Sequence, residues 1–202
     1  MKIRRVGASA LLLECSAADQ VEAWRAELWR RRQAGELTAV DIVPAALTVL
    51  IDGVPDPAAT AAALPGWTPP PHTATPPGPL VQIPTVYDGD DLPAVATGWD
   101  ITVAETIDRL SRAEWRVAFC GFAPGFAYLT GLPGPQVPRR PTPRPQVPTG
   151  SVALAGPYAG IYPTASPGGW QLVGRTDVTL FDVHRDPPAL LTPGTRVQLV
   201  AA

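Results

Sequence analysis

A long segment of the chain carries arginine as its only charged side chain. Residues 120–176 hold no Asp, Glu, Lys or His, and their fixed charges are Arg139, Arg140, Arg144 and Arg175. Guanidinium groups bind carboxylates and phosphates through paired hydrogen bonds. Such a segment is typical of a site that holds an anion or a flat ligand. It lacks the general base and the metal ligands that most self-sufficient enzymes need.

Three of these arginines lie in a proline-rich stretch. Arg139, Arg140 and Arg144 have proline neighbours in PRRPTPRP, residues 138–145. Proline restrains its own backbone and that of the residue before it, so the stretch stays extended. A preorganised guanidinium loses less entropy on binding, and each shielded charge-assisted hydrogen bond contributes about 1.5–3 kcal/mol. The stretch is predicted to contact a ligand; a solvated loop that docks a partner is the alternative.

Two glycine-containing segments could bring backbone and aromatic rings close to a ligand. Gly121–Phe126 reads GFAPGF, and Ser166–Trp170 reads SPGGW. Glycine allows close approach of a ligand or a positive φ. Trp170 would add a flat apolar wall. Tight barrel turns covered by an aromatic ring are the equal alternative for both segments.

The sequence offers little for a catalytic triad or a zinc site. Its two histidines, His72 and His184, and its two cysteines stand in unrelated contexts that match no zinc spacing. Asp182 and His184 would share one face of a strand and could touch. We interpret His184 as structural or exposed, because no serine is clearly placed to complete a triad. No metal site is expected.

Three aspartates precede a short predicted helix. Asp88, Asp90 and Asp91 fall within four residues. Such a cluster usually marks a solvated turn. A role as an acid or as a metal ligand is the alternative.

Composition indicates a globular protein. The chain has 202 residues, of which 46% are hydrophobic and 17% charged, with a net charge of −2. This supports a hydrophobic core and offers no basic field for nucleic acid. No apolar run reaches the ~20 residues that span a bilayer, so a membrane is not an expected partner. Two cysteines fit a reduced, cytoplasmic chain.

The first third of the chain predicts a small α+β domain over residues 1–68. Ile3–Leu13 is a predicted strand, although basic residues before an apolar run also resemble a short signal peptide. Ser16 and Asp19 fit a cap for the next helix. The predicted elements after the cap are a helix with the buried stripe Val21, Trp24 and Leu28, strand-forming residues over 42–51 and a short helix over 57–64.

Residues 69–79 form a stiff proline-rich linker by composition, and residues 80–202 are a second predicted domain. Thr102 and Glu105 form a capping box for a helix. The predicted strands are Leu80–Tyr87, Trp115–Cys120, Ser151–Ala155, Gly160–Tyr162, Trp170–Gly174, Val178–Val183 and Arg196–Val200. Many short strands with one helical insert predict a closed or nearly closed β-barrel. The fold class is therefore α+β.

Five ordered motifs resemble one protein family. They are GFAPGFAYLTGLP (121–133), PRRPTPR (138–144), VPTGSVALAG (147–156), GIYP (160–163) and SPGGWQLVGRT (166–176). Together they resemble the signature of the B subunit of 5-oxoprolinase. The same family includes the kinase inhibitor KipI, the chains called allophanate hydrolase subunit 1, and the matching part of urea carboxylase.

The resemblance implies a small N-terminal α+β domain followed by a cyclophilin-like β-barrel. It implies a component, inactive alone, of an ATP-dependent enzyme that converts 5-oxo-L-proline to L-glutamate. The A and C subunits of 5-oxoprolinase, the latter of related barrel fold, would be its partners, and ATP with Mg would act at the level of the complex. A histidine-kinase inhibitor of the KipI type, or a component of urea or allophanate metabolism, is the alternative.

The resemblance also implies a shared pocket or a subunit seam. The residues it places there are Phe122, Pro124, Gly125, Arg139, Arg144, Ser166, Gly168, Gly169, Trp170 and Arg175. The four arginines of the segment are expected to form one cradle for an anion, while another polypeptide completes the reaction. Catalytic residues are not assigned. Family members often carry a His where this chain has Leu110 after Arg109, and Leu110 is expected to pack in the core instead.

Overall fold

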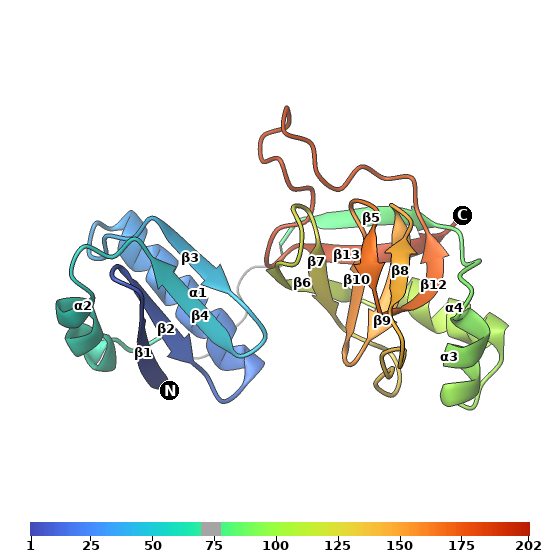
Figure 1. Cartoon of the computed structure of the whole chain (residues 1–202), viewed down its shortest axis with the longest axis horizontal. Coiled ribbons are helices and arrows are strands. Elements are labelled where there is room, and N and C mark those ends of the chain that lie inside the picture. The colour runs from blue at the N-terminus through green and yellow to red at the C-terminus, as the bar shows by residue number, and fades with distance from the viewer. Residues whose placement is uncertain (70–77) are drawn as a thin grey trace. The chain divides into compact units, whose positions relative to one another are not determined.

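The computed structural model describes residues 1–69 and 78–202, which divide into two compact units (Figure 1). The first unit comprises Met1–Pro76 and the second Pro77–Ala202. Each unit has its own hydrophobic core. Of the predicted linker over 69–79, residues 70–77 with His72 lie outside the described residues.

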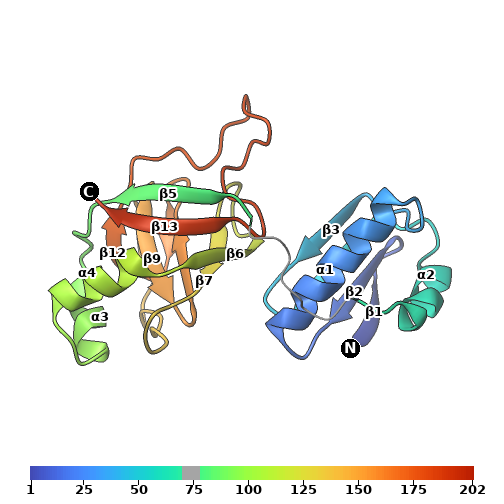
Figure 2. The ribbon, with the colours of Figure 1, turned by 180° about the vertical axis from the view of Figure 1, so that it is seen from behind.

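The first unit packs a long helix against a four-stranded antiparallel sheet (Figure 2). The strand order is β1-β2-β4-β3. Its elements are β1 (Lys2–Val6), β2 (Ala10–Glu14), α1 (Ala18–Gln33), β3 (Asp41–Pro44), β4 (Thr48–Asp52), α2 (Pro57–Ala63) and the 3-10 turn η1 (Leu64–Gly66). The predicted stripe of Val21, Trp24 and Leu28 is buried in the core of this unit, which confirms the helical periodicity.

Two predictions for the first unit are wrong in detail. The single strand expected over Ile3–Leu13 is a hairpin of β1 and β2, because the chain reverses at Gly7, whose φ is +58°. Ser16 and Asp19 do not cap α1, which begins after Ala17 without a side-chain cap. Instead the amide and hydroxyl of Ser16 donate to Gln20 Oε1, each at 3.1 Å.

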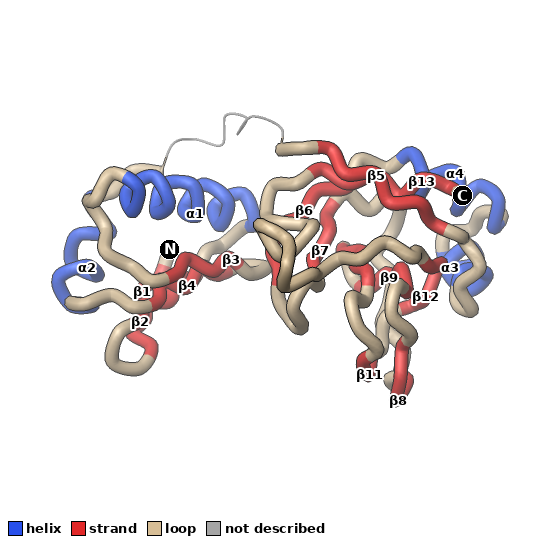
Figure 3. Tube along the Cα trace, turned by 90° about the horizontal axis from the view of Figure 1, so that it is seen from above, coloured by secondary structure: helices blue, strands red, loops and turns tan. Residues whose placement is uncertain are grey.

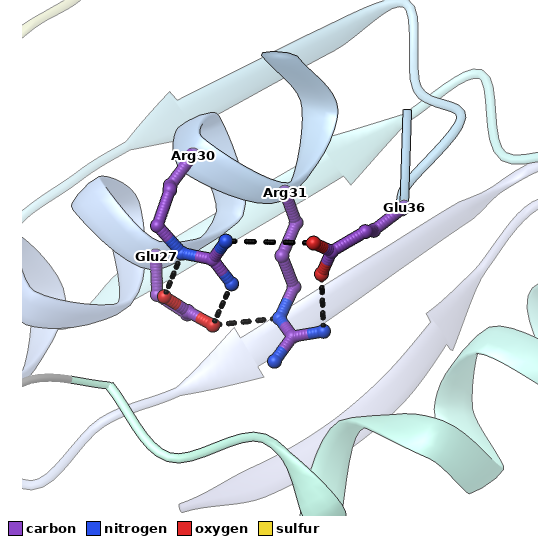
Figure 4. A network of polar contacts seen from close by, with 4 residues as sticks. All are labelled: Glu27, Arg30, Arg31 and Glu36. Carbon is purple, nitrogen blue, oxygen red and sulfur yellow. Dashed lines mark hydrogen bonds and ion pairs between the residues drawn. The ribbon is translucent and has the colours of Figure 1, made fainter. Parts of the chain in front are cut away.

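An ion-pair network fastens the carboxyl end of α1 (Figure 4). The buried Glu27 carboxylate accepts from Arg30 Nε at 2.9 Å and from Arg31 Nε at 2.6 Å. Arg31 also lies 2.9 Å from Glu36 in the turn after the helix, and its guanidinium stacks 4.3 Å from the Trp67 ring. The network therefore gives a buried carboxylate two partners and joins the helix end to the segment after η1.

The second unit is a seven-stranded sheet that curls into a nearly closed barrel (Figure 1). The strand order is β12-β9-β10-β7-β6-β13-β5, and β13 pairs with β5 in parallel. The edge strands meet at one point, where Val86 and Arg175 exchange two backbone hydrogen bonds of 2.9 Å. The described strands therefore form a barrel with one short seam between β5 and β12.

The elements of the second unit are β5 (Leu80–Thr85), α3 (Leu92–Gly98), α4 (Val103–Arg112), β6 (Trp115–Cys120), β7 (Ala127–Thr130), β8 (Arg144–Val147), β9 (Ser151–Ala155), β10 (Tyr158–Ile161), β11 (Ser166–Gly168), β12 (Gln171–Arg175) and β13 (Arg196–Ala201). Helix α3 packs on β12 and α4 on β13. Strands β8 and β11 pair separately and project beyond β9 and β12 (Figure 3).

Most of the predicted elements of this unit are confirmed. The strands over Trp115–Cys120 and Ser151–Ala155 have the expected bounds, and Thr102 and Glu105 form the predicted capping box. Leu110 is fully buried in the core, as expected. The predicted α+β class with a barrel domain is therefore confirmed.

The strand expected over Val178–Val183 is absent; that prediction is wrong. Residues 178–191 form a loop with one isolated bridge, between Phe181 and Ala189. The guanidinium of Arg185 donates to the carbonyls of Leu180 and Pro188 at 3.2 and 2.9 Å. The same two carbonyls also accept the backbone amides of Leu190 and Asp182, so the segment closes on itself around Arg185 instead of pairing with a strand of the sheet.

Tight packing around Gly160 in β10 can be tested by substitution. A Cβ at Gly160 would lie 2.8 Å from Phe126 Cζ, and that buried ring is held between Tyr162 and Trp170. Gly160→Ala should therefore lower the free energy of unfolding by about 1–3 kcal/mol in urea denaturation. Gly98→Ala is the matched control, since a Cβ there meets no atom within 4 Å. Equal stability of the two variants would contradict the packing.

Candidate functional site

A cavity of about 710 Å³ opens in the second unit. Its walls come from the β6–β7 turn, the loop before β8, the β9–β10 turn and the β11–β12 region. The aromatic residues that line it are Phe122, Phe126, Tyr128, Tyr158, Tyr162 and Trp170. The volume lies within the range of small-molecule sites, and the predominantly apolar walls are typical of them.

The aromatic walls form one interlocked cluster. Phe126 packs edge-to-face against Tyr162 at 5.4 Å and against Trp170 at 5.5 Å between ring centroids. Tyr128 contacts Trp170 at 5.6 Å and Tyr158 at 5.8 Å. Because each ring is fixed by two or more others, the wall is rigid before any ligand binds.

Phe122 stands out at the cavity because it is exposed and conformationally unusual. Its φ is +69°, a left-handed value that is rare for residues other than glycine. The residue is 62% exposed, and its ring packs edge-to-face on Phe126 at 5.2 Å between ring centroids. The GFAPGF turn therefore presents an aromatic face at the cavity, and this backbone strain is of the kind found at functional sites.

Arg139 brings a positive charge to the cavity. Within the described chain it is the one charged side chain that lines the walls. Its guanidinium nitrogens lie 3.7 Å from the position of a Cβ at Gly169. Burial raises the pKa of Tyr128 and of Tyr162, and the nearby Arg139 charge opposes both rises. The cavity walls therefore contain one cation, Arg139, and phenol groups that stay protonated at neutral pH.

The neighbouring arginines point to a buried carboxylate instead. Asp91 is 7% exposed at its side chain and lies before α3. Its Oδ1 accepts from Arg140 Nη1 at 2.8 Å and from Arg144 Nη2 at 3.0 Å. Its Oδ2 accepts from the Leu172 amide at 2.7 Å. One carboxylate therefore joins the start of α3, the segment over residues 138–144 (the arginine loop) and β12.

These partners decide the protonation state of Asp91. Burial alone would raise the pKa of this carboxyl, but the hydrogen bonds from Arg144 and the Leu172 amide outweigh it. The net pKa of Asp91 lies below its ordinary value. The group is an anion at neutral pH and a structural counter-charge, not an acid that donates protons.

The structure separates the arginines that the sequence grouped. The expectation that all four share one anion cradle is wrong, because Arg140 and Arg144 pair with Asp91, and Arg175 Nε lies 2.9 Å from Asp88 Oδ2. The physical reason is that acids from outside residues 120–176 neutralise three of the four. Arg139 alone among them lines the cavity.

The other predicted site residues fall into two groups. Phe122, Gly168 and Trp170 line the cavity with Arg139, and Gly169 lies against the Arg139 side chain. Pro124 is exposed beside Gly125, which takes φ +83° in the turn against Phe181. The Ser166 hydroxyl donates to the Thr164 carbonyl at 3.1 Å. A place at a subunit seam stays a prediction for Pro124, Gly125, Ser166, Arg144 and Arg175.

Sequence reasoning missed the tyrosines and assigned Asp91 to a solvated turn. Tyr128 and Tyr162 stand within two of the family motifs, in AYL and in GIYP. The signal that could have indicated them was their position, since Tyr128 lies within a short strand and Tyr162 directly follows one. Asp91 sits in a cluster of three aspartates, and only its burial distinguishes it from exposed Asp88 and Asp90. The predicted contact of Asp182 with His184 is between Asp182 Oδ1 and the His184 amide.

The described residues, 1–69 and 78–202, offer neither a metal site nor a membrane-spanning helix. No group of three His, Cys, Asp or Glu side chains in these ranges could hold a metal ion. None of their helices is both long and apolar enough to cross a membrane.

Comparison with known proteins identifies the family. The sequence profile of the carboxyltransferase domain, subdomain C and D, matches residues 1–191. The chain belongs to this family. The solved protein TTHA0988 is 32% identical, with a TM-score of 0.79 over 96% of this chain and 40% of that one. The Kluyveromyces lactis urea amidolyase, 20% identical over 99% of this chain and 15% of its own, has a TM-score of 0.76 and shows the fold alone.

A curated relative carries a functional name. The B subunit of 5-oxoprolinase from Escherichia coli O157:H7 is 46% identical over 125 residues. The match covers 60% of this chain and 57% of the relative, so the chain matches little more than half of the length of that protein. The predicted resemblance to the family of 5-oxoprolinase B subunits is thereby confirmed.

Substitutions of Asp91 and Asp88 should show that a buried ion pair contributes more to stability than an exposed one. Asp91→Asn removes the buried counter-charge of Arg140 and Arg144, so the free energy of unfolding should fall by about 2–3 kcal/mol in urea denaturation. The control is Asp88→Asn, whose exposed pair with Arg175 should contribute less than about 1 kcal/mol. A loss at Asp88 as large as that at Asp91 would show that burial does not set the difference.

The low pKa of Asp91 also predicts a pH dependence. A carboxyl whose pKa is lowered by folding contributes stability above its unfolded pKa of about 3.9, and that contribution is lost as pH falls through the folded value. The difference in unfolding free energy between the wild type and Asp91→Asn should be constant from about pH 7 to about pH 5 and shrink below about pH 4. A difference that grows on acidification would contradict the ionised state of Asp91.

Proposed function

We propose that this chain acts as the B subunit of an ATP-dependent 5-oxoprolinase, which converts 5-oxo-L-proline to L-glutamate together with the A and C subunits. The observation that carries the proposal is the 46% identity to a protein named as the B subunit of 5-oxoprolinase. The membership of the carboxyltransferase subdomain C and D family agrees with it. A cytoplasmic hetero-oligomer is part of the same proposal.

The chemistry of the cavity supports a role in binding. Opening a lactam requires an activated water and a group that accepts and returns protons. The described walls hold no carboxylate, His, Cys or Lys, and their tyrosines have raised pKa values, so they favour donors over bases. In this proposal the chain holds and orients the substrate, and residues of a partner protein move the protons.

ATP with Mg is expected for the complex, since the free energy of its cleavage drives the opening of the ring. The cavity does not fit this cofactor by itself. Magnesium needs oxygen ligands, usually one or two carboxylates, and phosphates need several cations or amides. The described lining offers one guanidinium and no acid. No step on ATP is therefore assigned to this cavity.

A carboxyltransferase component of urea or allophanate metabolism is the second candidate. It is favoured by the family description and by the likeness of fold to a urea amidolyase. That likeness at 20% identity concerns the fold, whereas the 46% identity concerns a component of 5-oxoprolinase. The first candidate is therefore preferred.

Reconstitution tests the proposal. The chain, with the A and C subunits from the same organism, should form L-glutamate from 5-oxo-L-proline in an ATP-dependent reaction, measured as glutamate and ADP. The chain alone should form neither, because the described walls of its cavity hold no carboxylate, His, Cys or Lys to transfer protons. Mixtures that lack one component, and mixtures supplied with urea or allophanate, are the controls.

Two outcomes would decide against this role. If the A and C subunits alone turn over 5-oxo-L-proline as fast as the complete mixture, the chain is not a component of that enzyme. If ATP cleavage depends on added urea or allophanate and not on 5-oxo-L-proline, the second candidate replaces the first.

A further inference from the structure

The cavity of the second unit joins one fixed cation, protonated tyrosines and stacked rings, and these features restrict its ligand. We propose that it binds a compact ring that carries a single carboxylate, with Arg139 holding the carboxylate, and that nucleotide binds outside it. The name of the ligand, 5-oxo-L-proline, rests on the proposed function; the preference for a monocarboxylate rests on the structure.

The backbone around Arg139 is fixed on both sides. The Arg140 amide donates to the Gly169 carbonyl at 2.8 Å, and Gln171 Nε2 donates to the Pro138 carbonyl at 3.1 Å. The Arg140 guanidinium is tied to Asp91 at 2.8 Å. Three attachments therefore hold the residues that flank Arg139, so its guanidinium is aimed at the cavity before a ligand arrives.

The Arg139 charge has no carboxylate partner within the described residues, unlike Arg140, Arg144 and Arg175. A carboxylate that enters the cavity would meet a guanidinium whose donors are not used by a protein acid. Guanidinium and carboxylate form two parallel hydrogen bonds, which fix the orientation of the ligand as well as its charge.

The tyrosines supply further donors. Tyr128, Tyr158 and Tyr162 line the cavity, and in the described part of the chain their hydroxyls make no hydrogen bond to protein. Burial raises the pKa of all three, so the phenols stay protonated at neutral pH. Protonated hydroxyls can donate to a carboxylate or to a lactam carbonyl, while the rings of Phe126 and Trp170 cover an apolar ring.

Charge, not size, selects the ligand. A cavity of about 710 Å³ is larger than a five-membered ring needs, so its walls alone would not exclude a nucleotide. A triphosphate brings several negative charges and a Mg²⁺ that needs oxygen ligands. One guanidinium cannot balance that charge, but it matches one carboxylate.

Nuclear magnetic resonance of the ¹⁵N-labelled full chain tests this proposal. Titration with 5-oxo-L-proline should shift the amides of Gly168 and Gly169 and the Trp170 indole in a saturable way. 2-Pyrrolidinone, which keeps the ring but lacks the carboxylate, should bind at least about tenfold more weakly. Mg·ATP should leave these three signals unshifted.

Variants assign the carboxylate to its partner. Arg139→Gln should weaken 5-oxo-L-proline binding by about tenfold or more, and Arg139→Lys should weaken it less, because lysine keeps the charge and loses the paired geometry. Arg112→Gln is the matched control, since Arg112 pairs with Asp108 on the surface of α4. Equal affinity for the two ring compounds, unchanged binding by Arg139→Gln, no binding of 5-oxo-L-proline, or cavity shifts on Mg·ATP addition would each overturn the proposal.

The comparison of ring compounds uses the wild-type chain, so it decides the question even if an Arg139 variant fails to fold. The two proposals also fail separately. A complex that turns over 5-oxo-L-proline although the chain does not bind it would overturn the carboxylate site alone. A chain that binds it through Arg139 in an inactive complex would overturn the 5-oxoprolinase role alone.

Discussion

The arrangement of the cavity depends on one buried carboxylate. Asp91 receives hydrogen bonds from Arg140, Arg144 and the Leu172 amide, and its own amide donates to the Leu172 carbonyl at 2.9 Å. A charge this far from water is stable only with partners of opposite sign and satisfied acceptors. Since those partners lie on the arginine loop and on β12, the requirement of Asp91 fixes the loop against the barrel.

The same requirement sorts the arginines by role. Arg140 and Arg144 form ion pairs with the buried Asp91. The backbone between Pro138 and Arg140 is hydrogen-bonded to residues of the Gly169–Gln171 region. Arg139 lies between these hydrogen-bonded neighbours, and its side chain lines the cavity. Adjacent residues of identical type thus differ in function because the fold supplies an acid to one and an open aromatic space to the other.

The sequence predicted local features well and long-range pairing poorly. The capping box of Thr102 and Glu105 and the stripe of Val21, Trp24 and Leu28 depend on residues three or four positions apart, and both are present. The arginines were misread because Asp88 and Asp91 lie far upstream of them, and residues 120–176 by themselves do not reveal those partners.

The conformation of residues 178–191 likewise depends on contacts that the local sequence pattern does not show. The apolar and β-branched residues of this segment fit a strand, but Arg185 supplies hydrogen-bond donors to nearby carbonyls. The cavity itself was half predicted: Phe122, Arg139, Gly168 and Trp170 came from the family motifs. Tyr128 and Tyr162 stand in the same motifs but were not assigned to the site, because the sequence does not show toward which side a tyrosine hydroxyl points.

The pairing of β5 with β13 has a consequence for biosynthesis. The first strand of the second unit lies in parallel beside the strand over Arg196–Ala201, and Gln82 and Gln198 on these strands are 116 positions apart. A ribosome releases the chain from its amino end, so β5 emerges long before its neighbour exists. Until then β5 has an unsatisfied edge, and the barrel can be completed only after residue 201 has left the exit tunnel.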